Sequence, residues 1–138
     1  MSKPETPLLT VDAVILYEKN KIVLIRRKNP PFQGEHALPG GFVDIGETVE
    51  NACVREAKEE TNLDVQIKKL IGVFSEPNRD PRGHTVSVAF LCTPVRKTQN
   101  PKAQDDASSL DIVPINQISK MKLAFDHKEI LRKSGILN

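Results

Sequence analysis

Apolar residues recur along the chain in short stretches that have the character of β-strands. Residues 10–17 and 21–27 are rich in β-branched and other apolar side chains and flank the polar triplet Glu18-Lys19-Asn20, which predicts a β-hairpin. Further strands are predicted for residues 65–74, 85–92 and 110–115. Residues 85–92 alternate, which places on one face Val86, Val88, Phe90 and Cys92, and on the other Thr85, Ser87, Ala89 and Leu91.

Two other segments have the spacing and end signals of helices. Val49, Ala52 and Cys53 recur at helical intervals and form an apolar stripe. Further along, Asp126-His127-Lys128-Glu129 has the form of a helix cap with a glutamate three residues later, and Gly135 is placed to end that helix. A chain of 138 residues is long enough for one core, so we expect a single domain spanning residues 1–138.

The first of these helices becomes acidic on its apolar side. Glu56, Glu59 and Glu60 fall within about 100° of one another around the helix axis and largely overlap the stripe that begins at Val49. Carboxylates that lean toward a core are costly unless they are paired or bind a metal. A solvated acidic patch is the alternative. Because the chain has no cysteine and histidine cluster of zinc-site spacing, we expect Mg²⁺ or Mn²⁺ rather than zinc.

Glycines precede this helix. The segment Leu38-Pro39-Gly40-Gly41 ends a short extended stretch in a turn, and Gly46 stands just ahead of Glu47. Glycine lets the backbone approach a ligand closely, so such a loop could offer a carbonyl to a metal or amides to a phosphate. A plain strand-to-helix connection explains Gly46 equally well, but it explains the Pro-Gly-Gly less well.

Residues 41–63 together resemble the Nudix box of the Nudix hydrolases. The matching residues stand at fixed offsets and are Gly41, Glu47, Arg55, Glu56, Glu59 and Glu60. The resemblance implies an α/β/α sandwich with a mixed β-sheet, and a divalent-metal hydrolase that cleaves a nucleoside diphosphate linked to another group. It implies that the metal ligands are Glu56, Glu59, Glu60 and the backbone carbonyl of Gly40. It also implies that Glu47 and Arg55 pair to brace the loop against the helix.

Two positions depart from the family pattern. Asn62 stands where the family usually has glycine, and Ala57 stands where it has a bulkier aliphatic residue. Asn62 is expected just past the helix in the left-handed conformation, which asparagine tolerates best after glycine. Ala57 fills less of the core but touches none of the chemistry. Neither departure changes the predicted metal site.

Charge and cysteine content limit the classes of partner. The chain has 20 basic and 18 acidic residues, so its formal net charge of +2 creates no overall field that favours nucleic acid or membrane. The first residues lack the apolar run of a signal peptide, and no segment has the 18 apolar residues of a membrane span, so we expect a cytoplasmic protein. Cys53 and Cys92 each lie in an apolar pattern, which favours buried reduced thiols over a disulfide.

Residues 75–84 form the segment on which the choice of substrate depends. This loop contains two arginines and a histidine, and arginine binds phosphate oxygens through a planar fork, although a solvated surface loop is the alternative. Several short matches together resemble the ADP-ribose pyrophosphatase branch of the Nudix family: Asn29-Pro30-Pro31-Phe32, Ala37-Leu38-Pro39-Gly40-Gly41, Arg79-Asp80-Pro81-Arg82-Gly83-His84 and Phe125-Asp126-His127. That resemblance implies hydrolysis of ADP-ribose to AMP and ribose 5-phosphate, by a homodimer that could share the substrate loop.

The residues predicted to bind substrate are Arg27, Phe32, Arg79, Arg82 and His84. Arg26 and Arg27 are neighbours on a strand, so only one can point inward. His36 stands where related sequences commonly have tryptophan, so stacking on adenine would depend on Phe32, Phe74 or another phenylalanine, each of which more often packs in a core.

The chemistry requires a carboxylate that takes a proton from water. Glu60 is one candidate, and Asp105 or Asp106 on a later loop is another. The residues predicted for catalysis are Glu47, Arg55, Glu56, Glu59 and Glu60. Two alternatives to ADP-ribose hydrolysis stay open. One is a MutT-like enzyme that hydrolyses nucleoside triphosphates of the 8-oxo-dGTP type, and the other is a module that senses ADP-ribose without catalysis.

Overall fold

The computed structural model describes residues 3–96, 99–104 and 107–137. Its elements follow one another as β1 (Leu8–Tyr17), β2 (Lys21–Arg27), β3 (His36–Ala37), β4 (Gly40–Phe42), α1 (Val49–Thr61), β5 (Val65–Phe74), β6 (Thr85–Pro94), β7 (Ala107–Pro114), the 3₁₀ helix η1 (Ile115–Lys120) and α2 (His127–Ser134). Among the described residues, no helix is long and apolar enough to cross a membrane.

The strands form one mixed sheet in the order β3-β2-β1-β6-β5, with β4 also paired to β1 and β7 also paired to β2. The long β1 runs parallel to β6, whereas all its other neighbours and the remaining pairs are antiparallel. On its other edge β1 changes partner. Residues 10–12 pair with β4 and residues 16–17 pair with β2. The predicted hairpin is therefore confirmed, and the change of partner opens the sheet between β2 and β4.

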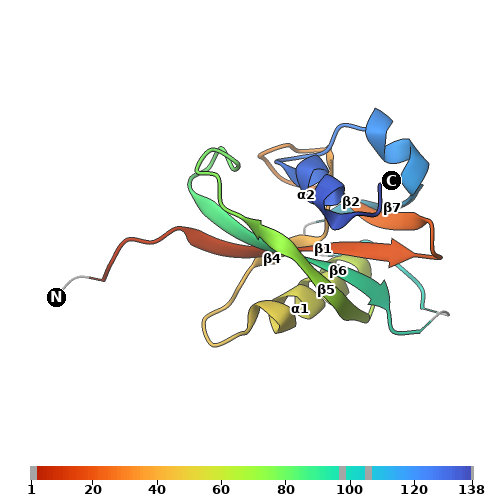
Figure 1. Cartoon of the computed structure of the whole chain (residues 1–138), viewed down its shortest axis with the longest axis horizontal. Coiled ribbons are helices and arrows are strands. Elements are labelled where there is room, and N and C mark those ends of the chain that lie inside the picture. The colour runs from red at the N-terminus through yellow and green to blue at the C-terminus, as the bar shows by residue number, and fades with distance from the viewer. Residues whose placement is uncertain (1–2, 97–98, 105–106, 138) are drawn as a thin grey trace.

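Helices cover both faces of the sheet, so the predicted α/β/α sandwich is confirmed (Figure 1). On one face α1 packs Ala52, Cys53 and Ala57 onto Phe90 and Cys92 of β6 and the odd-numbered apolar residues of β1. On the other face α2 and η1 pack onto a second cluster, which includes Val14, Ala89 and Leu91. The alternation predicted for residues 85–92 is therefore correct, because successive side chains of a strand point to opposite faces.

The ends of the two helices differ from each other in how they are formed. In α1 the side chain of Thr48 accepts from the Asn51 amide, and Asn62 closes the helix in the left-handed conformation, as predicted, with φ of 63°. In α2 Gly135 ends the helix with φ of 84°, also as predicted. Asp126 stands at the N-cap position of α2, as predicted, but its carboxylate makes no capping hydrogen bond and binds Arg79 instead.

The two cysteines are free and buried, as predicted. Their sulfur atoms, on Cys53 of α1 and Cys92 of β6, lie 3.7 Å apart. The hydrogen bond to Cys92 and burial both raise the pKa of the Cys53 thiol, so it stays protonated and unreactive.

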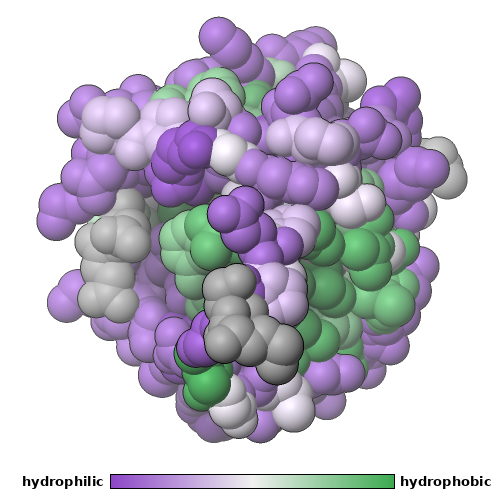
Figure 2. All heavy atoms as spheres, turned by 90° about the vertical axis from the view of Figure 1, so that its left-hand side faces the viewer, coloured by the Kyte–Doolittle hydropathy of each residue, from purple (hydrophilic) through white to green (hydrophobic). Residues whose placement is uncertain are grey.

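The face of the molecule that Figure 2 shows is largely hydrophilic, with an apolar area to one side.

Candidate active site

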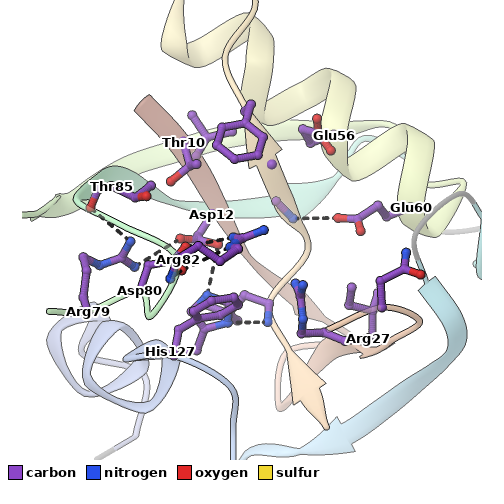
Figure 3. Close-up of a pocket in the computed structure, with 18 of the residues that line it drawn as sticks. Thr10, Asp12, Arg27, Glu56, Glu60, Arg79, Asp80, Arg82, Thr85 and His127 are labelled. Atoms are coloured by element: carbon purple, nitrogen blue, oxygen red, sulfur yellow. Dashed lines mark hydrogen bonds and ion pairs between the residues drawn. The ribbon is translucent and has the colours of Figure 1, made fainter. Parts of the chain in front are cut away.

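A cavity of about 320 Å³ opens where β1 changes partner between β4 and β2. Figure 3 shows the side chains of α1 on one side of it and a group from β1, the loop after β5 and α2 on the other. The residues that line it are Thr10, Val11, Asp12, Ile25, Arg27, Asn29, Pro30, Leu38, Gly40, Gly41, Phe42, Asp44, Glu56, Glu60, Arg79, Asp80, Arg82, Thr85, Phe125 and His127. Segments far apart in the sequence therefore meet at this one opening.

Arg55 organises the acidic side of the site. Its Nε and Nη2 donate to Glu47 at 2.7 and 2.9 Å, and its Nη2 also donates to the carbonyl of Phe42 at 3.0 Å. Its Nη1 donates to Glu56 at 2.9 Å and to Glu59 at 3.1 Å. The hydrogen bonds from Arg55 lower the pKa of Glu47 to about 2, and those bonds in turn raise the pKa of Arg55. One guanidinium thus ties the loop before α1 to two carboxylates on α1.

Glu60 is held separately from this group. Its side chain is buried, with only 4% of the residue exposed, and Oε1 accepts a hydrogen bond from the Gly40 amide at 2.7 Å. Glu56 and Glu60 both line the cavity, whereas Glu59 does not and has 43% of its side chain exposed. Two of the three predicted metal ligands therefore reach the cavity wall.

Close packing explains the two glycines of β4. A Cβ atom at Gly40 would lie 2.2 Å from the carbonyl oxygen of Val11. A Cβ atom at Gly41 would lie 2.6 Å from the carboxylate of Glu56, far inside any real contact distance. The backbone of β4 therefore lies directly against β1 and an acidic side chain of α1, which only glycine permits.

The donor chemistry on this side fits a hard divalent cation. Glu56, Glu59 and Glu60 offer only carboxylate oxygens, which such ions prefer. Within the described ranges of the chain, no three acidic, histidine or cysteine side chains converge closely enough to enclose a metal by themselves. An ion such as magnesium, which keeps several waters and binds substrate phosphates, requires only a few protein ligands.

The opposite side of the cavity is built on a buried aspartate. Asp12 lies in the middle of β1 with 6% of its surface exposed, and its oxygens contact Ser87 Oγ at 2.5 Å and His127 Nε2 at 3.3 Å. Burial alone would raise the pKa of Asp12, but the neighbouring His127, Ser87 and Arg79 outweigh burial and lower it. Asp12 is therefore an anion inside the fold.

Arg79 is paired with acidic side chains inside the protein. Its guanidinium donates to both oxygens of Asp126, at 2.9 and 2.6 Å, and lies 3.9 Å from Asp12, with only 4% of its side chain exposed. Burial opposes its charge, but the hydrogen bonds to Asp126 outweigh burial and raise the pKa of Arg79. Its charge is already balanced inside the protein, so it lines the cavity without offering its full charge to a phosphate.

Arg82 and Arg27 are the more accessible arginines. Arg82 pairs with the buried carboxylate of Asp80 at 2.8 Å, yet 47% of its side chain is exposed. Its guanidinium lies 5.9 Å from the ring centre of Phe42 and 5.6 Å from that of Phe125. Arg27 lies 4.9 Å from the Phe125 ring, and its Nε donates to the Pro31 carbonyl at 2.6 Å. Both cations therefore gather around one aromatic ring at the cavity wall.

Two of the residues predicted to bind substrate lie outside the cavity lining. Phe32 packs against Phe125, with ring centres 4.9 Å apart, and does not line the cavity. His84 is also absent from the cavity lining, because its Nε2 hydrogen-bonds the Ser75 carbonyl at 3.0 Å within the loop. As predicted, only one of the adjacent arginines points into the cavity, since Arg26 contacts Asp111 on the other side of the strand. The alternative bases Asp105 and Asp106 lie outside the described residues.

Sequence reasoning missed Asp12, and it assigned no role to His127 or Phe125. Asp12 carried a usable signal, because it is a charge within the apolar run of residues 11–15. His127 and Phe125 stood in a short match to the ADP-ribose pyrophosphatase branch. Their positions at the cavity depend on how the segment before α2 returns to β1, which no local pattern specifies.

Comparisons with known proteins show the family of this chain. The family model described as the NUDIX domain matches residues 6–134. An ADP-ribose pyrophosphatase from Methanocaldococcus jannaschii is 50% identical over 126 residues, covering 91% of this chain and 72% of that protein. The chain belongs to the Nudix family.

Two further relatives are informative. An ADPR responsive transcriptional repressor, NtrR, from Acinetobacter baylyi is 35% identical over 135 residues, which cover 94% of this chain and 53% of the repressor. The crystal structure of a bifunctional NMN adenylyltransferase/ADP ribose pyrophosphatase from Francisella tularensis, complexed with AMP and a Mn ion, aligns with a TM-score of 0.83 at 29% identity. That alignment covers 95% of this chain and 42% of the other. This chain thus spans about half the length of either protein.

Proposed function

We propose that this protein hydrolyses ADP-ribose to AMP and ribose 5-phosphate with the help of Mg²⁺ or Mn²⁺. The observation that carries the proposal is the two-sided cavity, which has Glu56 and Glu60 on one wall and the arginines Arg27 and Arg82 on another. Both walls suit a diphosphate, because a divalent cation held by carboxylates and a guanidinium group each bind phosphate oxygens. The 50% identity to an archaeal ADP-ribose pyrophosphatase supports this choice of substrate.

Each side of the cavity has a separate task in this proposal. A bound divalent cation would neutralise the diphosphate and make water a better nucleophile. Glu56, Glu59 and Glu60, with the Gly40 carbonyl, would hold it, and Arg55 sets the directions of Glu56 and Glu59 through its hydrogen bonds.

On the substrate side, Arg82 and Arg27 would bind phosphate or ribose oxygens, because their guanidinium groups lie at the cavity. Phe125, whose ring both guanidinium groups contact, would hold these two arginines at the cavity wall. Arg79 has a different task, which is to hold Asp126 and Asp12 in place.

Glu60 is our choice for the general base. It is the most buried of the three helix glutamates, and the Gly40 amide fixes one of its oxygens. A carboxylate in a confined and oriented position transfers a proton more effectively than a solvated one.

Replacing Glu60 with glutamine tests this assignment. Loss of a positioned base lowers rates by about 10²- to 10⁴-fold, so Glu60→Gln should lower kcat by at least about 100-fold while thermal unfolding changes little. Glu50→Gln is the matched control, since Glu50 is an exposed glutamate in the first turn of the same helix. Full activity in Glu60→Gln would remove this residue from the mechanism.

A substrate panel tests the proposed function itself. Purified protein is incubated with Mg²⁺ or Mn²⁺ and, separately, with ADP-ribose, NADH, ordinary triphosphates and 8-oxo-dGTP. AMP and ribose 5-phosphate from ADP-ribose are the expected products, and chelation of the metal should stop their formation. Preferential release of pyrophosphate from the triphosphates would favour the MutT-like alternative instead.

Sensing without catalysis is the second candidate function. The repressor NtrR is a relative, which is the specific observation that favours it. We favour the enzyme because all the box carboxylates are present and two of them line the cavity. We also propose that the protein acts on small molecules rather than nucleic acid, in the cytoplasm and as a homodimer. Its unpaired thiols fit a reducing compartment, and the exposed Leu70 and Val73 on the edge strand β5 fit a subunit contact.

A further inference from the structure

A buried polar group lies behind the segment that leads into β4. Asp12, Ser87 and His127 are its members, and their exposed fractions are 6%, 0% and 4%. Dashed lines in Figure 3 join His127 to Asp12 and to a backbone amide, which is that of Leu38. Burying a carboxylate is costly, so such a group is retained only when its partners satisfy it or when it does something the site needs.

The contacts of His127 determine where its ring proton lies. The Leu38 amide donates to Nδ1 at 2.9 Å, so Nδ1 must carry a lone pair. The proton of the neutral ring is therefore on Nε2, which lies 3.3 Å from Asp12 Oδ1 and is the ring nitrogen that can donate to it. The other oxygen of Asp12 accepts from Ser87, which fixes the carboxylate. Asp12 thus selects the tautomer of His127 in which the Nδ1 lone pair can accept from the Leu38 amide.

The segment that receives this lone pair also holds Glu60. Leu38 is buried and donates to His127, the Pro39 carbonyl accepts from Ala13 at 2.8 Å, and the Gly40 amide donates to Glu60 at 2.7 Å. Proline has no amide proton, so Leu38 and Gly40 provide the only two donors of these three residues. One donor binds His127 and the other binds the proposed base. A change at His127 should therefore reach Glu60 through two residues of backbone.

We propose that His127 is a positioning residue which, as the Nε2–H tautomer selected by Asp12, holds Leu38 and so keeps the Gly40 amide aimed at Glu60. Its kinetic consequence rests on the proposed function, because Glu60 is the proposed base of that reaction. The positioning itself is a property of the fold and can be measured without substrate.

Two substitutions separate the two contacts of the ring. In His127→Asn the side-chain oxygen can lie near the position of Nδ1 and accept from Leu38, whereas in His127→Gln the longer side chain places its amide near Nε2, toward Asp12. We expect His127→Gln to lower kcat about 10- to 100-fold with KM changed less than threefold, because small misplacements of catalytic groups cost rate rather than binding. His127→Asn should restore most of that rate.

A matched control is His36→Gln, since His36 contacts Asp111 and does not line the cavity. It should leave kcat unchanged. Equal losses of kcat in His127→Gln and His127→Asn, in proportion to lost thermal stability, would mean that the ring only fills space and would overturn the proposal.

Nitrogen NMR tests the positioning directly on the wild-type protein, whose three histidines make assignment simple. We expect a neutral His127 with its proton on Nε2, and slow hydrogen exchange at the Leu38 and Gly40 amides that becomes faster in His127→Gln. A proton on Nδ1 of His127 would overturn the proposal even if both variants failed to fold. If the wild type hydrolyses no ADP-ribose, the proposed function fails, and these spectra still decide the positioning.

Discussion

Replacing Gly41 with alanine should disable the active site while leaving the fold intact. The new methyl group would lie 2.6 Å from the carboxyl carbon and one oxygen of Glu56, whereas ordinary contact begins at 3.4 Å. The carboxylate would therefore have to move by about 0.8 Å. Because it is the far end of a flexible side chain rather than backbone, the movement costs little stability.

The loss of rate follows from the size of that movement. A misplacement of about 1 Å in a catalytic constellation costs about 100-fold, which corresponds to about 2.7 kcal/mol of transition-state stabilisation. We expect Gly41→Ala to lower kcat for ADP-ribose by that factor. Its unfolding free energy should fall by only about 1 kcal/mol, the average for a single substitution.

Two other glycines serve as controls in the same assay, which combines steady-state kinetics with urea unfolding. Gly72→Ala in β5 meets only Phe74 ring atoms, at 3.7 Å or more, and should change neither measurement. Gly40→Ala would place its methyl 2.2 Å from the backbone oxygen of Val11, so it should lose stability as well as activity. The reasoning is refuted if Gly41→Ala keeps a kcat within threefold of Gly72→Ala.

Two further predictions concern the charged groups. Arg79→Ala should lower the unfolding free energy by about 3–5 kcal/mol, because it leaves Asp12 and Asp126 without their buried cation. Adding Asp126→Asn to this variant should recover part of the lost free energy. If urea unfolding shows that the losses of the two substitutions add, Arg79 and Asp126 are not coupled. The pKa of Glu47 is lowered from 4.5 to about 2 by Arg55, so its ionised form stabilises the fold above about pH 4.5, and that contribution is lost as pH falls toward 2. Glu47→Gln should flatten the unfolding curve in this window, and an unchanged acid dependence would show that the pair does not contribute.

Local sequence patterns were sufficient for most of the secondary structure. The alternation in residues 85–92 assigned both faces of β6 correctly, because a strand that separates two apolar layers must alternate between them. The close of α1 at Asn62 and of α2 at Gly135 also followed from local conformational preference. At Asp126 local pattern predicted the position of the helix start but not the bond: the carboxylate leaves the helix amides uncapped, because a buried arginine 47 residues away in sequence is a stronger partner for it.

The active site, like the secondary structure, could be predicted only where it depends on residues close together in the chain. The spacing of Arg55, Glu56, Glu59 and Glu60 is a local property, since one helix brings residues three and four apart together, and the sequence alone was enough to predict an acidic helix face. The sequence could not tell which arginines are available to substrate. Arg79 and Arg82 look alike in one loop, yet the first is buried against Asp126 and the second is half exposed beside Phe42 and Phe125.

By itself, then, the sequence determined most of the elements, the faces of β6, the family resemblance and the acidic helix, because each of these depends on residues that are close together in the chain; the short β3, β4 and η1 were not predicted. Tertiary structure decided which groups from distant parts of the chain meet at the site. Asp12 from β1, His127 at the start of α2 and Leu38 before β4 form one chain of contacts that ends at Glu60. Pairings over such separations depend on how the sheet opens between β2 and β4, which is a property of the whole fold rather than of any one segment.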